Sequence, residues 1–181
     1  SIMNDKYEAV VKYEQKLDNL GRFFADRGLS LQTFSKKIRH TLVADTHLDI
    51  DITNCHPVIL LQYCDNHNID CDCIRDYVNN REERLQELMK VFHTDRDTVK
   101  ELMISLLYLG KVSDYAIKND LQGEANTFPA WLDTFEKEMK NISGRFQQEN
   151  VVLFNIIKEQ NITGKDSPIA TTMSYVLGDI E

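Results

Sequence analysis

Apolar and polar positions alternate with two different periods along the chain, and each period predicts a different kind of element. Over residues 5–20 apolar side chains recur at helical spacing among charged ones, which predicts an amphipathic helix that Gly21 stops. From Arg22 to Gln32 this period is lost, which favours short extended pieces or a hairpin. The strict alternation of residues 48–52 predicts a β-strand.

The predicted strand carries two carboxylates. Asp49 and Asp51 would share one face, and the apolar residues Leu48, Ile50 and Ile52 the other. An aspartate that ends a buried strand just before a helix is a common Mg²⁺ ligand, because the strand fixes the carboxylate and Mg²⁺ prefers oxygen. Asp51 fits that description. The alternative is an exposed sheet face with two acidic residues.

Beyond residue 52 the pattern is almost wholly helical. Pro57 suits the first turn of a helix, and residues 70–93 predict one long charged helix. Thr94 or Asp95 is expected to cap a helix that runs to Leu109.

The C-terminal third is also predicted to be mainly helical. We expect a loop over residues 123–128, one or two helices over 129–161, and a last helix capped by Asp166 or Ser167 with Pro168 in its first turn. The predicted fold class is therefore mainly α with a small β element (α+β).

Composition narrows the class of protein. The chain has 181 residues, 42% of them hydrophobic, with 7 Gly and 3 Pro, which excludes collagen-like and wholly disordered chains. No apolar run approaches the roughly 20 residues that a membrane helix needs, and the first residues do not resemble a signal peptide. We expect a soluble intracellular protein with no membrane partner.

The cysteines do not predict a disulfide framework. Cys55, Cys64, Cys71 and Cys73 lie within 19 positions, so reduced thiols are the default. A zinc site that includes His56 and His67 is the alternative, but the spacing lacks a paired C-x-x-C.

Charge is unevenly distributed. The net charge is -8, yet residues 22–42 carry five Lys or Arg and only one acidic residue. This segment suits a nucleic-acid backbone, but charge alone favours the alternative of a solvated basic loop.

The predicted helix up to Leu109 carries a cationic and aromatic stripe. Arg96, Lys100 and Tyr108 are spaced at multiples of four, which places them along one winding line of roughly 18 Å. Two cations near a helix N-terminus can receive a triphosphate, and an aromatic ring further along can meet a base. The alternative is ordinary surface cations and a core tyrosine.

The order of these features resembles that of family A DNA polymerases, in particular the divergent branch of viruses and transposons called TV-Pol. The matching segments follow one another over nearly the whole chain: Gly21-Arg22-Phe23, Ser30-Leu31-Gln32, Ile38-Arg39, Asp51 to Pro57, the set Arg96, Lys100 and Tyr108, and residues 167–181. The resemblance implies the palm-start and helical fingers portion of a right-hand polymerase fold.

The resemblance also implies roles. Asp51 would be the catalytic Mg²⁺ ligand, Arg96 and Lys100 would hold the phosphates of a dNTP, and Tyr108 would lie by the nascent base pair. The residues that would bind primer-template DNA are Arg22, Gln32 and Arg39.

Three departures from the family pattern change what it implies. His56 stands where the family has the glutamate that acts against ribonucleotides, so by resemblance His56 would bind the nucleotide, and the preference for deoxyribose or ribose is open. If Asp49 were the ligand, Asn54 would take that place, but Thr53 favours Asp51. Leu109 separates Tyr108 from its glycine. The third motif, with the second metal-binding aspartate, is absent from these residues.

We therefore expect a fragment of a viral or mobile-element replication protein, or a polymerase relative without chemistry. Three parts are predicted: the first palm strand and its basic segment (1–60), a helical fingers-like region (61–165) and a truncated helix that returns to the palm (166–181). The fragment alone would be inactive. By resemblance only, a helicase or primase domain in the parent chain would fit this branch, and the protein would act in the virus or in the host cytoplasm or nucleus. The alternative is a non-catalytic helical module that binds nucleic acid or protein. Three questions stay open: whether the template is DNA or RNA, whether the substrate is a dNTP or an NTP, and which organism is the host.

Overall fold

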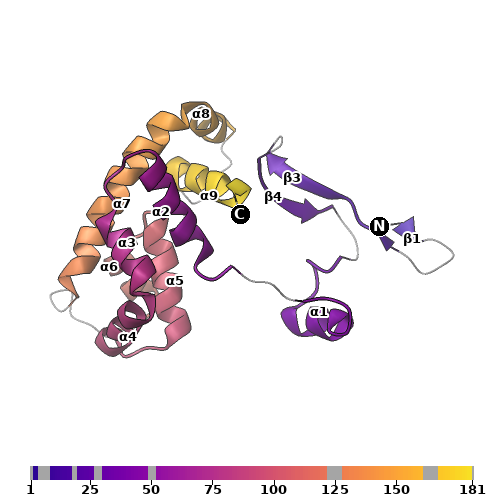
Figure 1. Ribbon diagram of the computed structural model, residues 1–181, viewed down its shortest axis with the longest axis horizontal. Helices are drawn as coiled ribbons and strands as arrows, with labels where there is room; N and C mark the ends of the chain where they lie inside the picture. The colour runs from indigo at the N-terminus through magenta and orange to yellow at the C-terminus, as the bar shows by residue number, and fades with distance from the viewer. Residues whose placement is uncertain are drawn as a thin grey trace.

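A computed structural model describes residues 2–3, 9–17, 20–26, 30–48, 52–121, 128–160 and 167–180. Figure 1 shows that the described chain divides into two parts. Residues 2–48, called the arm, hold the strands and one short helix. Residues 52–180, called the helical body, hold the other helices. The chain is mainly helical with a small β element, as the sequence predicts.

The arm begins with two short antiparallel ladders. β1 (Ile2–Met3) pairs with β2 (Ala9–Val10), and β3 (Tyr13–Leu17) pairs with β4 (Leu20–Ala25). In the second ladder Tyr13 lies opposite Ala25 and Gln15 opposite Phe23. Helix α1 (Lys36–Val43) follows and has no buried residue.

The helix predicted over residues 5–20 is wrong, because Tyr13–Leu17 is a strand. Apolar positions at 10, 11, 13 and 17 fit both periods, and β-branched and aromatic residues there favour the strand. Tertiary contact decides between the two: Leu17 is buried against Leu153 and Ile157 of the body. Gly21 does not stop a helix; it lies inside β4 with a φ of +81°. The predicted extended structure after residue 22 is confirmed over Arg22–Ala25.

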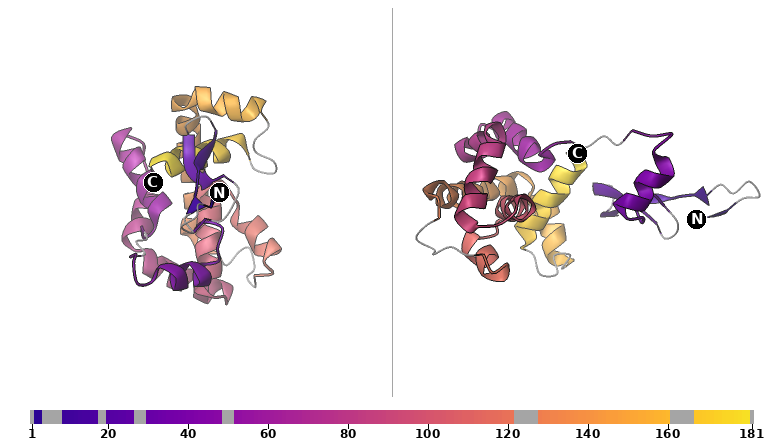
Figure 2. Two further views of the ribbon diagram at one scale, coloured as in Figure 1. Left: turned by 90° about the vertical axis from the view of Figure 1, so that its right-hand side faces the viewer. Right: turned by 90° about the horizontal axis from the view of Figure 1, so that it is seen from below.

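The body consists of helices in the part of the chain that the structure describes. They are α2 (Cys55–Asn66), α3 (Asp72–Asn79), α4 (Arg81–Phe92), α5 (Arg96–Leu107), α6 (Val112–Lys118), α7 (Ala130–Glu149), α8 (Val151–Glu159) and α9 (Pro168–Ile180). Figure 1 shows α7 running along the body, with α2 to α6 gathered on one side of it. The right-hand view of Figure 2 shows α9, in yellow, at the side of the body that meets the arm. None of the described helices is long and apolar enough to cross a bilayer.

One continuous core holds the body together. It contains fully buried aromatic residues, of which Phe92 is 1% exposed and Phe135 and Phe146 are 0% exposed, and they are surrounded by leucines from α2, α4 and α5. Burial of each such aromatic side chain is worth roughly 1.5–3 kcal/mol, so this core supplies most of the folding free energy.

Local signals correctly place the starts of three helices. Pro57 lies in the first turn of α2, the Asp95 carboxylate accepts a hydrogen bond from the Thr98 N–H at 2.8 Å, and Ser167 Oγ accepts one from the Ala170 N–H at 3.2 Å. These caps satisfy backbone N–H groups that the first helical turn leaves unpaired.

The single helix predicted over residues 70–93 is wrong, because Asn80 separates the end of α3 from the start of α4. The Asn80 amide donates to Asp76 at 2.8 Å, and such a local side-chain bond competes with helix continuation. The second break, at Asn150 between α7 and α8, was allowed by the prediction of one or two helices.

Some predictions fall on residues that the structure does not describe. These are residues 49–51 of the predicted strand, residues 123–127 of the predicted loop, and Asp166. At the flanks of the predicted strand, Leu48 and Ile52 belong to no strand and are 90% and 55% exposed. The three-part division of the chain stays a prediction.

Candidate functional site

Three of the predicted site residues, far apart in sequence, meet at the junction of the arm and the body. Arg22 comes from β4, His56 from the first turn of α2, and Tyr108 follows the last residue of α5. A guanidinium nitrogen of Arg22 lies 3.2 Å from His56 Nε2, and the Tyr108 hydroxyl lies 2.5 Å from His56 Nδ1. His56 therefore connects Arg22 to Tyr108, and we call these three residues the triad.

Hydrogen-bond chemistry assigns the His56 tautomer. Arginine has only donors, so His56 Nε2 must accept from Arg22. A neutral imidazole then carries its proton on Nδ1 and donates it to the Tyr108 hydroxyl oxygen. Protonation of Nε2 would remove the acceptor that Arg22 uses, so the triad needs a neutral His56.

The surroundings of the triad favour neutral side chains. Burial, and next the positive charge of Arg22, lower the pKa of His56 below its ordinary value. Burial raises the pKa of Tyr108 to about 12, against smaller opposing effects of a Ser174 hydrogen bond and the Arg22 charge. The site therefore presents one cation beside a neutral imidazole and a neutral phenol at physiological pH.

Helix α9 positions Arg22. The Gly21 N–H donates to Asp179 Oδ1 at 3.3 Å, and the Arg22 side chain passes over Gly178. A Cβ at Gly21 would come within 2.8 Å of the Tyr175 ring, so the close approach of β4 to α9 requires glycine there. The sequence pattern did not single out Tyr175, Gly178 or Asp179.

Two cavities border the triad and share Ser174. The first, of about 260 Å³, lies between β4 and α9 and is lined by Gly21, Arg22, Phe24, His56, Ser174 and Tyr175. The second, of about 540 Å³, lies between the end of α5 and the start of α9. Residues that line it include Ile104, Ser105, Tyr108, Ser167, Thr171 and Ser174. Hydroxyl groups and apolar side chains share this second wall, and its one aromatic ring is that of Tyr108.

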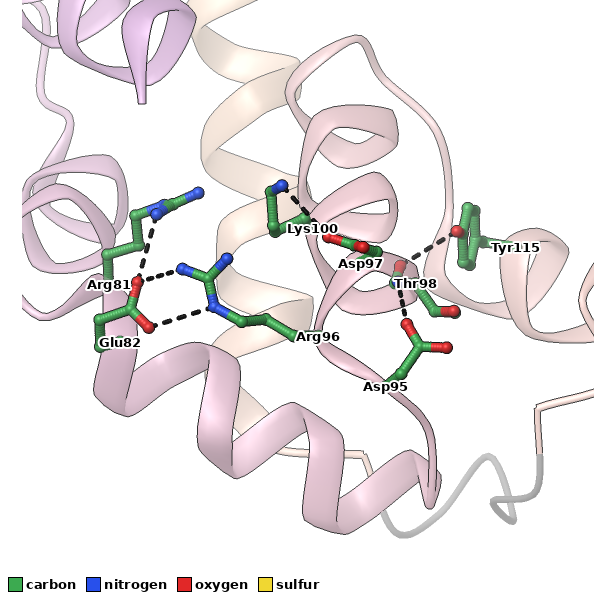
Figure 3. Close-up of polar contacts among 8 residues, drawn as sticks. All are labelled: Arg81, Glu82, Asp95, Arg96, Asp97, Thr98, Lys100 and Tyr115. Carbon is green, nitrogen blue, oxygen red and sulfur yellow. Dashed lines mark hydrogen bonds and ion pairs between the residues drawn. The ribbon is translucent and has the colours of Figure 1, made fainter. Parts of the chain in front are cut away.

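The predicted phosphate ligands lie elsewhere on α5. Figure 3 shows Arg96 and Lys100 at the N-terminal end of the helix, each beside an acidic residue. Arg96 donates to Glu82 of α4 at 2.5 Å, and Lys100 lies 3.3 Å from Asp97. Eight positions of helical rise separate Lys100 from Tyr108, about 12 Å. The two cations are thus near each other but are not part of the triad.

The remaining predicted DNA ligands lie in the arm. The Gln32 amide accepts from the Ala25 N–H at 2.8 Å and donates to the Phe23 carbonyl at 3.0 Å, so it caps the open edge of β4. Arg39 lines a cavity of about 280 Å³ along α1, together with His40, Val43 and His47. The structure does not bring Gln32 and Arg39 to the triad.

The catalytic and metal prediction, Asp51, lies outside the described residues, as does Asp49. Helix α2 begins at Cys55, four residues after Asp51. Its N-cap, Asn54, takes a left-handed φ of 58°, a conformation that asparagine tolerates. Among the described residues no three His, Cys, Asp or Glu side chains are grouped so as to hold a metal. The Mg²⁺ prediction therefore rests on Asp51 alone.

The cysteines are free thiols. Cys64 and Cys71 are buried, and Cys55 and Cys73 are partly buried. Burial, the largest cause, raises the pKa of Cys64 to about 12 and that of Cys73 to about 11, which keeps both thiols protonated. Cys64 and Cys73 therefore act as small apolar residues rather than as nucleophiles.

Comparison with known proteins finds one relative to report. The chain is 37% identical over 155 residues to "Putative helicase V13" of Sputnik virophage, a match that covers 83% of this chain and 20% of the relative. This chain thus spans about one fifth of the length of that protein. No protein-family model matches the chain, and no solved structure matches it.

Proposed function

We propose that the chain is the palm-start and fingers portion of a family A-like, template-directed DNA polymerase, within a longer replication protein of a virus or mobile element. In this proposal the parent protein transfers nucleotides from dNTPs to a primer with Mg²⁺. The 181 residues alone are inactive, because the third motif with the second metal-binding aspartate is not among them.

The triad is the observation that carries the proposal. By resemblance, Arg22 would contact the primer-template, His56 the sugar of the incoming nucleotide and Tyr108 the nascent base pair. These roles require the three side chains to be neighbours, although 34 and 52 positions separate them along the chain. A chance match of short motifs gives no reason for that contact, whereas a nucleotide site does.

The virophage relative supports the longer protein. Its name implies a helicase, and the helicase motors of the P-loop class carry the sequence GxxxxGK[ST]. These 181 residues contain no such sequence. We therefore assign the helicase activity of the parent protein to chain outside the matched segment, and the nucleotide and primer-template contacts to this segment.

Phosphate binding would require Arg96 and Lys100 to exchange partners. Both are exposed at the N-terminal end of α5, where the helix dipole favours an anion. Their present partners, Glu82 and Asp97, are exposed as well, and exposed ion pairs are weak. A triphosphate with more charge than either carboxylate can displace them.

The test is equilibrium binding of a dNTP and of primer-template DNA, with Mg²⁺, to the chain and its variants. We expect Lys100→Ala to weaken dNTP binding several-fold and Arg22→Ala to weaken DNA binding. Lys158→Ala on α8 removes the same charge from an exposed site on a helix other than α5 and is the matched control. Equal effects of Lys100→Ala and Lys158→Ala would contradict the assigned phosphate site.

The alternative is a non-catalytic helical module, and one observation favours it. Arg96 and Lys100 already have acidic partners, as ordinary surface cations do. This alternative predicts no nucleotide binding and indifference to Arg96→Ala and Lys100→Ala, so the same experiment distinguishes the two functions.

A further inference from the structure

One face of the β3–β4 hairpin displays two exposed aromatic rings. Tyr13 lies opposite Ala25 and Gln15 opposite Phe23, so these four residues share one face of the ladder. Tyr13 is 46% exposed and Phe23 is 58% exposed. Arg22 and Phe24, which line the cavity beside the triad, alternate with Phe23 and belong to the opposite face. The face of Tyr13 and Phe23 is therefore separate from the triad.

Two cations follow this aromatic face within a few residues along the chain. Gln32 is bonded to the backbone of Phe23 and Ala25, which fixes the start of the segment that leads into α1. Lys36 follows four positions later, so chain length keeps its Cα within about 14 Å of that of Gln32. Lys36 and Lys37 are exposed. We call Tyr13, Phe23, Lys36 and Lys37 the hairpin platform.

The charge of the whole chain directs a polyanion to this platform. Residues 49–181 carry 13 Lys or Arg against 23 Asp or Glu, whereas residues 1–48 carry 8 against 6. The body therefore repels nucleic acid and the arm attracts it. Charge alone does not distinguish single strands from duplexes, but exposed rings do, because unpaired bases have free faces for stacking.

We propose that the hairpin platform binds single-stranded nucleic acid, with bases stacked on Tyr13 and Phe23 and phosphates paired with Lys36 and Lys37. This binding surface is additional to the nucleotide site of the proposed function and does not depend on it. Alternate aromatic and cationic groups are the standard means by which proteins hold single strands with little sequence preference.

Fluorescence anisotropy of labelled 20-nucleotide oligo(dT), oligo(U) and a duplex of equal length tests the proposal. We expect single strands to bind more tightly than the duplex, and Tyr13→Leu/Phe23→Leu to weaken single-strand binding about tenfold or more. Lys36→Gln/Lys37→Gln should flatten the salt dependence by about two phosphate contacts. Comparison of oligo(dT) with oligo(U) decides whether DNA or RNA is the preferred source of the strand.

Matched controls lie on the body. Lys137→Gln/Lys158→Gln removes the same charge from exposed positions of α7 and α8, and Ile117→Ala changes a side chain that is 82% exposed. Both should leave oligonucleotide affinity within about twofold of the parent chain, since surface positions away from a binding site contribute little.

A fluorescence experiment reports stacking directly. Trp131 is the one tryptophan of the chain, so Trp131→Phe gives a background without tryptophan, and Phe23→Trp in that background places the probe on the platform. Oligo(dT) should quench its emission and inorganic polyphosphate should not.

Equal affinity for duplex and single strands, or affinity unchanged by Tyr13→Leu/Phe23→Leu, overturns the proposal. Tyr108→Phe alters the triad and leaves the hairpin platform unchanged. If this variant loses dNTP binding but keeps oligo(dT) binding, the two sites are separate.

Discussion

The arm and the body of this molecule use apolar side chains in opposite ways. The body buries Phe92, Phe135 and Phe146 almost completely, whereas the arm leaves Phe23 more than half exposed and its helix α1 has no buried residue. The arm's one buried apolar strand residue, among those described, is Leu17, which packs on α8. Folding free energy thus comes mainly from the body, whereas the arm leaves aromatic rings and cations exposed.

The two parts meet along α9, where stability and function become linked. The Tyr175 ring lies close to Gly21, and the Asp179 carboxylate accepts a hydrogen bond from the Gly21 N–H. The same contact aims Arg22 at His56. Changes at this junction should therefore alter the triad without unfolding the body, and changes in the body core should do the reverse.

The largest expected effect comes from the same substitution made once in each part. Phe135→Ala removes a fully buried ring and should lower the free energy of unfolding by about 3–5 kcal/mol. Phe23→Ala in the arm should change it by no more than about 0.5 kcal/mol. Urea unfolding measures both. A comparable loss for Phe23→Ala would mean that the arm's aromatic face is buried in solution, for instance in a dimer.

A pair of glycines tests the junction. Gly21→Ala places a side chain at a φ of +81° and against Tyr175, so it should cost about 1–3 kcal/mol and release β4 from α9. Gly144 lies in α7 with nothing within 4 Å of a new Cβ, so Gly144→Ala should instead stabilise by about 0.5–1 kcal/mol. Thermal unfolding and amide exchange of β4 report the two outcomes; protection in β4 that survives Gly21→Ala contradicts the role given to this contact.

The pH dependence of the triad has a definite sign. The pKa of His56 is lowered in the folded protein, so the unfolded chain binds a proton more readily. Its contribution to stability is therefore full above the ordinary value of 6.5 and is lost as the pH falls through and below that value. Arg22→Gln removes one cause and should move the pKa of His56 upward in an NMR titration. A pKa of His56 that does not respond to Arg22→Gln would show that the two side chains are not in contact in solution.

The smallest expected effect concerns the exposed pair at the start of α5. Glu82→Gln removes the partner of Arg96 and should hardly change the unfolding midpoint, because exposed pairs are screened by solvent. It should strengthen binding of inorganic triphosphate modestly, since Arg96 is then available. Glu83→Gln makes the same charge change one residue along and is the control. Identical triphosphate affinities in the two variants would remove Arg96 from the phosphate site.

Local signals allowed the helices, but not the site, to be predicted. Asp95, Ser167 and Pro57 mark helix starts because capping acts within one turn. The hairpin was misassigned because its apolar positions fit two periods and the deciding contact, Leu17 on α8, is distant in sequence.

The order of the motifs along the chain placed Arg22, His56 and Tyr108 in one hypothesis, but their separation in the sequence does not give the distances between their side chains. Only the packing of β4, α2 and α5 around α9 shows that they touch. Tyr175 and Asp179 gave no signal of their own, since a tyrosine and an aspartate near the end of a helix are ordinary. The one available signal was Gly21, which interrupts a strand where a helix closely approaches it.

The triad as a nucleotide site is tested most directly by the ring resonances of its histidine. In an NMR titration with a dNTP and Mg²⁺, we expect the His56 ring signals to shift in a saturable manner and those of His67, which pairs with Glu149 at the other end of α2, to stay unchanged. Tyr108→Phe should weaken the response at His56. Unchanged His56 signals at millimolar dNTP, or equal shifts at His56 and His67, would contradict a nucleotide site at the triad.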